Sequence, residues 1–181
     1  MAFVSYELLT QAYPARRMKE NVRRLKDYDV FHCLLAGSAE RAAAVKKRVA
    51  GLPESFLAWL NVCDGGMLFD TAMLTTKSHD ADLDLDFETY GDYHKAELRK
   101  NKNIADGWFV FAEAVHSDVF FFDMGKKDGK VYQWDAEENG VYAVWPSFED
   151  WLTDQINEAV GLIANEELDP LDIKLEAGID E

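Results

Sequence analysis

The segment GLPESFLAWLNVCDGGMLF, residues 51–69, is the feature that most constrains what this chain can fold into. After Pro53, apolar side chains recur at three- and four-residue spacing, which predicts a short helix with one apolar face. We expect Gly65 or Gly66 to end this helix, because glycine adopts the left-handed conformation without a Cβ penalty. The residues from Met67 to Leu74 then predict one strand.

The composition is that of a folded globular protein with a sizeable core. The chain has 181 residues, 48% of them hydrophobic and 13% aromatic, which is in the range of one domain. The first residues lack the pattern of a signal peptide, and no apolar run of about eighteen residues is present to span a bilayer. We therefore expect a cytoplasmic protein without membrane contact. Cys33 and Cys63 lie among apolar neighbours, which favours reduced, buried thiols over a disulfide.

The net charge of −15 is unevenly distributed along the chain. Residues 1–50 carry ten Lys/Arg and five Asp/Glu, whereas residues 51–181 carry nine Lys/Arg and twenty-nine Asp/Glu. A surface this negative repels phosphate backbones, so direct nucleic-acid binding is not expected. It attracts basic proteins instead, although solubility alone is the simpler interpretation of such a charge.

The first fifty residues predict two helices around a short apolar run. A basic cluster within residues 16–26 fits a helix after Pro14, either with a solvated basic face or docked on an acidic part of the chain or on a dimer mate. Phe31 to Ala36 is compatible with a strand or with a buried connector. Ser38 is a suitable N-cap for a helix that extends to Ala50.

The second half of the chain predicts a sheet closed by a helix. Asp128-Gly129 and Asn139-Gly140 are signals for type I′ hairpin turns, which need positive φ at both central residues. A final helix after Ser147 carries a long apolar face. Four tryptophans and one phenylalanine are expected in the core, namely Trp59, Trp108, Trp134, Trp151 and Phe148. We expect an antiparallel meander of four strands: Trp108–Ala114, Val119–Met124, Lys130–Trp134 and Val141–Trp145.

No pattern in the sequence predicts a catalytic or metal site. The four histidines form no H-E-x-x-H or H-x-H motif, and no P-loop or G-x-S-x-G is present. The aspartates at 80, 82, 84 and 86 alternate as in a calcium loop, but glycine and glutamate are missing where that loop needs them. Cys63 lies at a predicted helix C-terminus, where a thiolate is not favoured. We therefore expect no enzyme, no metal and no cofactor, and a hydrolase that uses scattered carboxylates is the least favoured alternative.

Several short motifs, taken in order, resemble the SMI1/KNR4 family of the SUKH superfamily. Leu52 to Gly66 matches a Leu-Pro-acid-x-aromatic-Leu helix that leads into an Asn-x-x-(Asp/Asn)-Gly-Gly turn. Later motifs are Ile104 to Trp108, Lys130 to Asp135, and Ser147 to Leu152. The resemblance covers roughly residues 39–163 and implies an α+β fold, an antiparallel sheet of about four to six strands covered by helices.

The resemblance implies a domain arrangement and a protein-binding function. Residues 38–164 would form the family-like domain, with residues 1–37 as an N-terminal extension that contains the basic helix and 165–181 as an acidic tail, in one globular unit. Many bacterial members look like immunity proteins that neutralise toxins, often nucleases, and fungal relatives look like cell-wall-synthesis regulators. We expect a non-enzymatic immunity protein that binds a basic toxin domain. The alternatives are a regulator or scaffold that acts through protein partners, and self-association as a homodimer.

The candidate contact residues are exposed acids and one histidine in the predicted loops. The turn between the first two strands of the predicted meander departs from the glycine-rich family pattern and keeps only its acid, so the binding face there is expected to differ from that of relatives. For each single residue, an ordinary solvated side chain is the simpler interpretation. The predicted protein-binding residues are Asp80, Asp82, Asp84, Asp86, Glu113, His116 and Asp118.

Overall fold

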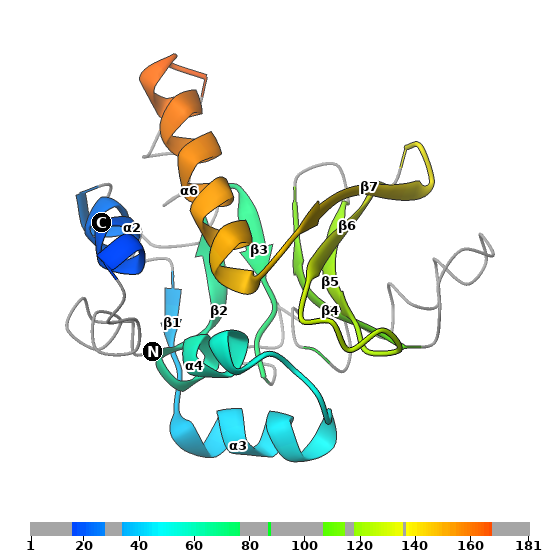
Figure 1. Cartoon of the computed structure of the whole chain (residues 1–181). Helices are drawn as coiled ribbons and strands as arrows, with labels where there is room; N and C mark the ends of the chain where they lie inside the picture. The colour runs from blue at the N-terminus through cyan, green and yellow to red at the C-terminus, as the bar shows by residue number, and fades with distance from the viewer. Residues whose placement is uncertain are drawn as a thin grey trace, which may run out of the picture.

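The computed structural model of the chain contains one antiparallel sheet with helices packed against it (Figure 1). It describes residues 16–27, 34–76, 87, 107–114, 118–135 and 137–167. Within these ranges the sheet has seven strands, and their order in space is their order along the chain. The α+β class and the helix-covered antiparallel sheet are confirmed, although the sheet is larger than the expected four to six strands.

The extra strands come from the first half of the sheet, where a single predicted strand is a hairpin. Strands β2 (Cys63–Leu68) and β3 (Thr71–Met73) pair through Leu68 and Thr71. A two-residue turn at Phe69 and Asp70 joins them, and Phe69 adopts a φ of 55° while its ring is buried. The prediction of one strand over Met67–Leu74 was wrong because a buried phenylalanine in a turn hides the chain reversal.

Gly65 and Gly66 do not end the predicted helix after Pro53, as was expected of one of them. Helix α4 (Glu54–Val62) passes directly into β2 through Cys63, which is extended, so no left-handed glycine ends it. Gly65 has a φ of 88°, and a Cβ at this position would lie 2.6 Å from the carbonyl oxygen of Met73. Glycine is therefore required for close contact between β2 and β3.

Two short elements, a strand and a helix, precede helix α4. Strand β1 (Leu34–Ala36) is the first strand of the sheet and pairs with β2, which answers the question left open for this apolar run. Helix α3 (Ala39–Arg48) begins at the predicted cap, where the Oγ atom of Ser38 accepts a hydrogen bond from the Arg41 amide at 3.2 Å. Pro53 precedes α4 as its N-cap residue.

The four predicted strands of the second half are confirmed with small changes at their ends. They are β4 (Trp108–Glu113), β5 (Val119–Asp123), β6 (Val131–Asp135) and β7 (Gly140–Trp145). The hairpins form, but the predicted type I′ turns do not. Gly129 has positive φ without Asp128, and Asn139 has it without Gly140.

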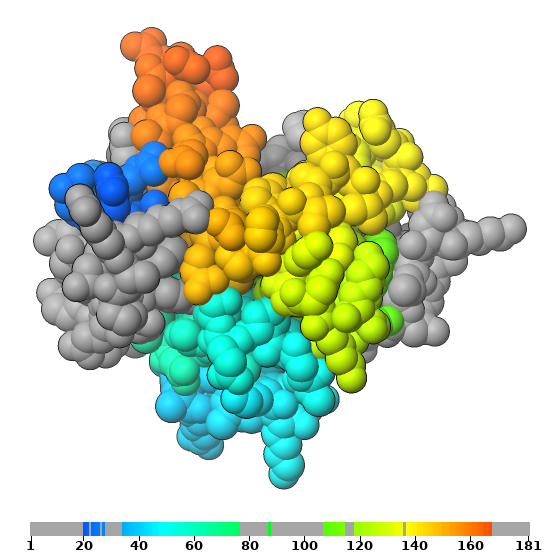
Figure 2. Space-filling view, in the orientation of Figure 1, coloured from blue at the N-terminus to red at the C-terminus, as the bar shows by residue number. Residues whose placement is uncertain are grey.

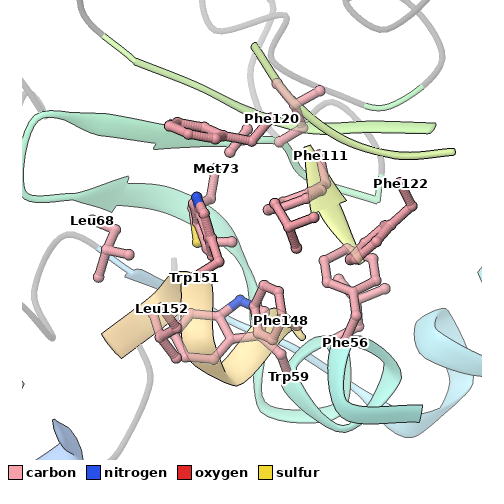
Figure 3. Close-up of a cluster of buried hydrophobic side chains, with 14 of the residues drawn as sticks. Phe56, Trp59, Leu68, Met73, Phe111, Phe120, Phe122, Phe148, Trp151 and Leu152 are labelled. Carbon is pink, nitrogen blue, oxygen red and sulfur yellow. The ribbon is translucent and has the colours of Figure 1, made fainter. Parts of the chain in front are cut away.

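One face of the sheet packs against α4 and α6 (Phe148–Ala164) through aromatic side chains (Figure 3). Phe56 of α4 lies 5.1 Å from Phe122 and 5.3 Å from Phe148, measured between ring centroids. Trp151 of α6 packs at 4.9 Å against Phe111 and at 5.3 Å against Phe120. Helix α6 begins at the predicted cap Ser147. The residues expected in the core are buried, namely Trp59, Trp108, Trp134, Phe148 and Trp151.

The opposite face of β5 is also apolar. Phe121 stacks on Trp108 with 3.7 Å between ring centroids, and its other neighbour Tyr132 lies at 5.5 Å. Because successive side chains of a strand point to opposite faces, this row lies away from α4 and α6.

The basic helix α2 (Arg16–Asp27) packs against α6. Asn21 donates a hydrogen bond to the Thr153 hydroxyl at 2.7 Å, and Arg24 donates one to the Asn157 side chain at 2.5 Å. Leu25 is fully buried. Of the two docking alternatives for this helix, the structure shows contact with a helix of the same chain. Within the described ranges, no helix has the length and apolar character needed to cross a membrane.

Candidate protein-binding surface

Only two of the seven predicted contact residues fall within the described part of the chain. Glu113 ends β4, and Asp118 immediately precedes β5. The Ala114 amide donates a hydrogen bond to the Asp118 carbonyl at 2.9 Å, so the structure brings these two acids to the same end of the β4–β5 hairpin. The predicted residues Asp80, Asp82, Asp84, Asp86 and His116 lie outside the described residues.

Both acids are half-buried and are held by their surroundings. The carboxylate of Asp118 accepts a hydrogen bond from the Gln133 side chain of β6 at 2.8 Å. Glu113 pairs with Ala72 of β3 and with Val119 of β5, which places it within the sheet. These contacts give Asp118 a structural role, because it joins the hairpin to the next strand.

The most deeply buried carboxylate is Asp64, which the sequence did not single out. Its side chain is fully buried in β2 and forms an ion pair with Arg41 of α3. It also accepts a hydrogen bond from the Thr76 amide at 2.7 Å. A buried charge needs such partners, so this group connects helix and sheet. A hollow of about 240 Å³ beside it is lined by Arg41, Ala44, Val45, Arg48 and Thr76.

Cys63 is not suited to nucleophilic chemistry. Its side chain is fully buried, and burial raises the pKa of its thiol well above the ordinary range. The Sγ atom lies 3.7 Å from the Gly65 carbonyl oxygen, to which the thiol donates. A thiol that stays protonated is a poor nucleophile and a poor metal ligand. Within the described ranges, no three His, Cys, Asp or Glu side chains gather as a metal site would require.

A polar cluster at the turn between β5 and β6 fixes the shape of that turn. The Tyr132 hydroxyl donates to Asp128 at 2.8 Å, and the Lys126 ammonium lies 4.2 Å from the centre of the Tyr132 ring. Lys126 also pairs with Asp123 at 3.4 Å. Burial, followed by the hydrogen bond to Asp128, raises the pKa of Tyr132, so the ring stays neutral. The cluster explains a folded turn and needs no ligand.

The sequence from β6 to the end of α6 carries charge of one sign only. Residues 131–167 contain nine Asp/Glu and no Lys, Arg or His. On α6, partial burial and repulsion from Asp70 and Asp154 raise the pKa of Glu158 above that of an ordinary glutamate. A raised pKa is the direction expected for a carboxyl group that is partly buried beside other carboxylates. Counting charges along this stretch could have located the acidic region from the sequence.

Strand β7 lies beside this acidic helix and exposes apolar side chains. It is the last strand of the sheet, and Val141, Tyr142 and Val144 are 51%, 70% and 49% exposed. They are the exposed large hydrophobic residues of the described chain. The indole N–H of Trp145 donates to Asp154 of α6 at 2.8 Å, which holds β7 next to that helix.

The exposed side chains of β7 belong to the edge of the sheet, which lies at the molecular surface (Figure 2). The hairpin that precedes β7 adds Glu137 and Glu138, both of which are exposed. In the space-filling view, the yellow surface of β7 and its hairpin adjoins the orange surface of α6. We call the exposed residues of this strand and its hairpin the β7 surface, and define it by Glu137, Glu138, Val141, Tyr142 and Val144.

The β7 surface was not predicted from the sequence. The alternation of Val141, Tyr142 and Val144 with small or buried residues predicts a strand, but not that the strand lies at the edge of the sheet. Which strand is last depends on the order of all strands in space.

The sequence model of the SMI1 / KNR4 family (SUKH-1) matches residues 38–154. The match extends from the cap of α3 into the first half of α6 and so includes the whole of β2 to β7. No curated protein matched the chain closely enough to be counted as a relative.

Proposed function

The chain belongs to the SMI1/KNR4 (SUKH-1) family, and we propose that it is a non-enzymatic immunity protein that neutralises a nuclease-like toxin domain by direct binding. The proposal places it in the cytoplasm of the cell that it protects. Inhibition by contact needs a complementary surface, and it needs no cofactor or reacting side chain. The partner is a basic protein domain, because a nuclease binds phosphate groups with Lys and Arg.

The observation that carries this proposal is the acidic region from β6 to α6, which contains no basic residue of its own. Nine Asp/Glu without a single basic residue between positions 131 and 167 create a negative potential over neighbouring elements. Carboxylates on such a surface can occupy the groove that a nuclease offers to phosphates. The same field attracts a basic partner over distance and repels nucleic acid.

We include the predicted acidic residues in this proposal. Glu113 and Asp118 lie at one end of the β4–β5 hairpin, where their charges add to the negative field of the sheet. The acids at 80, 82, 84 and 86, together with His116, are proposed as further contacts on the basis of the sequence pattern. Their contribution can be tested separately from that of the β7 surface.

The function is tested by co-expression with a toxin. We expect a large toxin-like open reading frame immediately beside the gene for this chain, and the probe is its C-terminal domain. Cells that express the domain alone should stop growing, and cells that also express this chain should grow. The purified chain should inhibit the domain's cleavage of nucleic acid at a one-to-one ratio. Continued growth arrest, together with unchanged cleavage, would refute the immunity function.

A further inference from the structure

Strand β7 has the composition of an interface centre with a charged rim. Three exposed apolar side chains lie in four consecutive positions, and Tyr142 is the most exposed of them at 70%. Glu137 and Glu138 of the preceding turn are exposed near the start of this strand. Protein interfaces commonly place apolar and aromatic residues at the centre and polar residues at the edge, and tyrosine is frequent among residues that dominate binding energy.

The register of β7 shows how this surface can be recognised. Gln133 pairs with Ala143 and Trp134 pairs with Val141, so Tyr142 is an extra residue that forms a β-bulge. A bulge bends an edge strand and interrupts its row of hydrogen-bonding groups. Regular addition of a partner strand along β7 is therefore disfavoured. The bulge directs a tyrosine outward instead, and this favours recognition through side chains.

The charge around β7 indicates which occupant it can accept. In a symmetric dimer of this chain, the same patch would face itself. Glu137 and Glu138 of both copies would then approach one another, and residues 131–167 offer no base to compensate. A second copy is therefore disfavoured, whereas Lys and Arg side chains around an apolar contact would pair with this rim.

We infer that the β7 surface is the docking site for the basic partner, with Tyr142 as the central anchor and Glu137 and Glu138 as the acidic rim. The inference rests on the proposed function, because the partner is the nuclease-like toxin domain. The apolar centre holds the complex together and controls its dissociation. The acidic rim speeds association and selects a basic partner over a neutral or acidic one.

The test is a binding-kinetics experiment with a catalytically inactivated form of the nuclease-like domain encoded beside this chain. Tyr142→Ala should weaken binding by about 30-fold, mainly through faster dissociation, and Tyr142→Phe should restore most of the affinity. Val144→Lys is a second, independent variant and should weaken binding in the same direction. Glu137→Gln combined with Glu138→Gln should mainly slow association. Glu20→Gln combined with Glu40→Gln removes the same charge from α2 and α3 as a matched control.

Each outcome bears on the inference in a different way. If the wild-type chain binds and both Tyr142→Ala and Val144→Lys bind within about twofold of it, the docking site is wrong while the proposed function stands. If the folded wild-type chain does not bind the domain, the proposed function and the docking site both fail. If the chain alone sediments as a dimer that Tyr142→Ala separates, the occupant is a second copy and the inference is overturned.

Discussion

At the scale of single residues, two ion pairs of helix α3 illustrate how burial decides the value of a charge. Arg41 pairs with the fully buried Asp64, whereas Lys46 pairs with Glu54 at 2.7 Å on an exposed surface. Water solvates Lys46 and Glu54 whether or not they are paired, so this ion pair contributes little to stability. Water cannot reach Asp64, whose charge depends on Arg41 and on the Thr76 amide.

Removing these two cations should therefore have very different effects. Arg41→Met removes a cation that pairs with a buried carboxylate and should lower the free energy of unfolding by about 3 kcal/mol. Lys46→Met, in the same helix, should lower it by less than about 1 kcal/mol. Urea denaturation at pH 7 measures both values. Equal losses in the two variants would show that Asp64 does not depend on Arg41.

The ionisation of Glu158 on α6 should lower the stability of the fold, whereas ionisation of a carboxylate with a favourable partner raises it. The pKa of Glu158 is raised in the folded state, so its ionised form destabilises the fold at neutral pH and its protonation at lower pH removes the penalty. Asp154 and Glu158 lie four residues apart on one helix, where like charges cost a few tenths of a kcal/mol.

Glu158→Gln should therefore stabilise the protein at pH 7 by a few tenths of a kcal/mol, and the gain should disappear by about pH 4. Thermal unfolding at several pH values measures this difference. Glu137→Gln, in an exposed turn, removes the same charge and is the matched control. A gain for Glu158→Gln that is as large at pH 4 as at pH 7 would contradict an electrostatic cause.

At the scale of elements, the helices and strands that could be predicted from the sequence are those with local signals. Ser38 and Ser147 cap helices because their hydroxyls accept bonds from amides three residues later, and such spacing is visible in the sequence. The β2–β3 hairpin was missed because its turn contains a buried Phe69 in place of an exposed glycine or asparagine. The edge position of β7 was also out of reach, since it depends on strand order.

Two glycines provide a test of which element positions require glycine. Gly65→Ala should lower the free energy of unfolding by more than about 2 kcal/mol, because positive φ and contact with the Met73 carbonyl both exclude a Cβ. Gly161 lies in α6, and no side chain of the described residues comes within 4 Å of the position that a Cβ would take there. Gly161→Ala should therefore raise stability by about 0.5–1 kcal/mol. Guanidinium denaturation measures both, and a harmless Gly65→Ala would contradict the tight β2–β3 contact.

At the scale of the whole molecule, charge is separated between elements that touch. The helix α2 belongs to the basic first fifty residues, and it packs against α6 within the stretch that has no basic residue. One side of α6 is therefore next to cationic residues of the same chain. Asp154 lies instead at the junction of α6 with β7, where it accepts the Trp145 hydrogen bond. The negative field available to a partner is consequently centred on the β7 side of this helix.

This separation predicts how salt acts on complex formation. Raising the ionic strength from about 0.01 M to 0.15 M shortens the screening length from about 30 Å to 8 Å. Association with the basic domain should slow by at least about tenfold, while dissociation, set by the apolar contact of Tyr142, should change little. Stopped-flow mixing over a salt series measures both rates. In the Glu137→Gln, Glu138→Gln variant the dependence on salt should be shallower, because fewer charges steer the encounter. An association rate independent of salt in the wild type would mean that the acidic surface has no part in bringing the partner in.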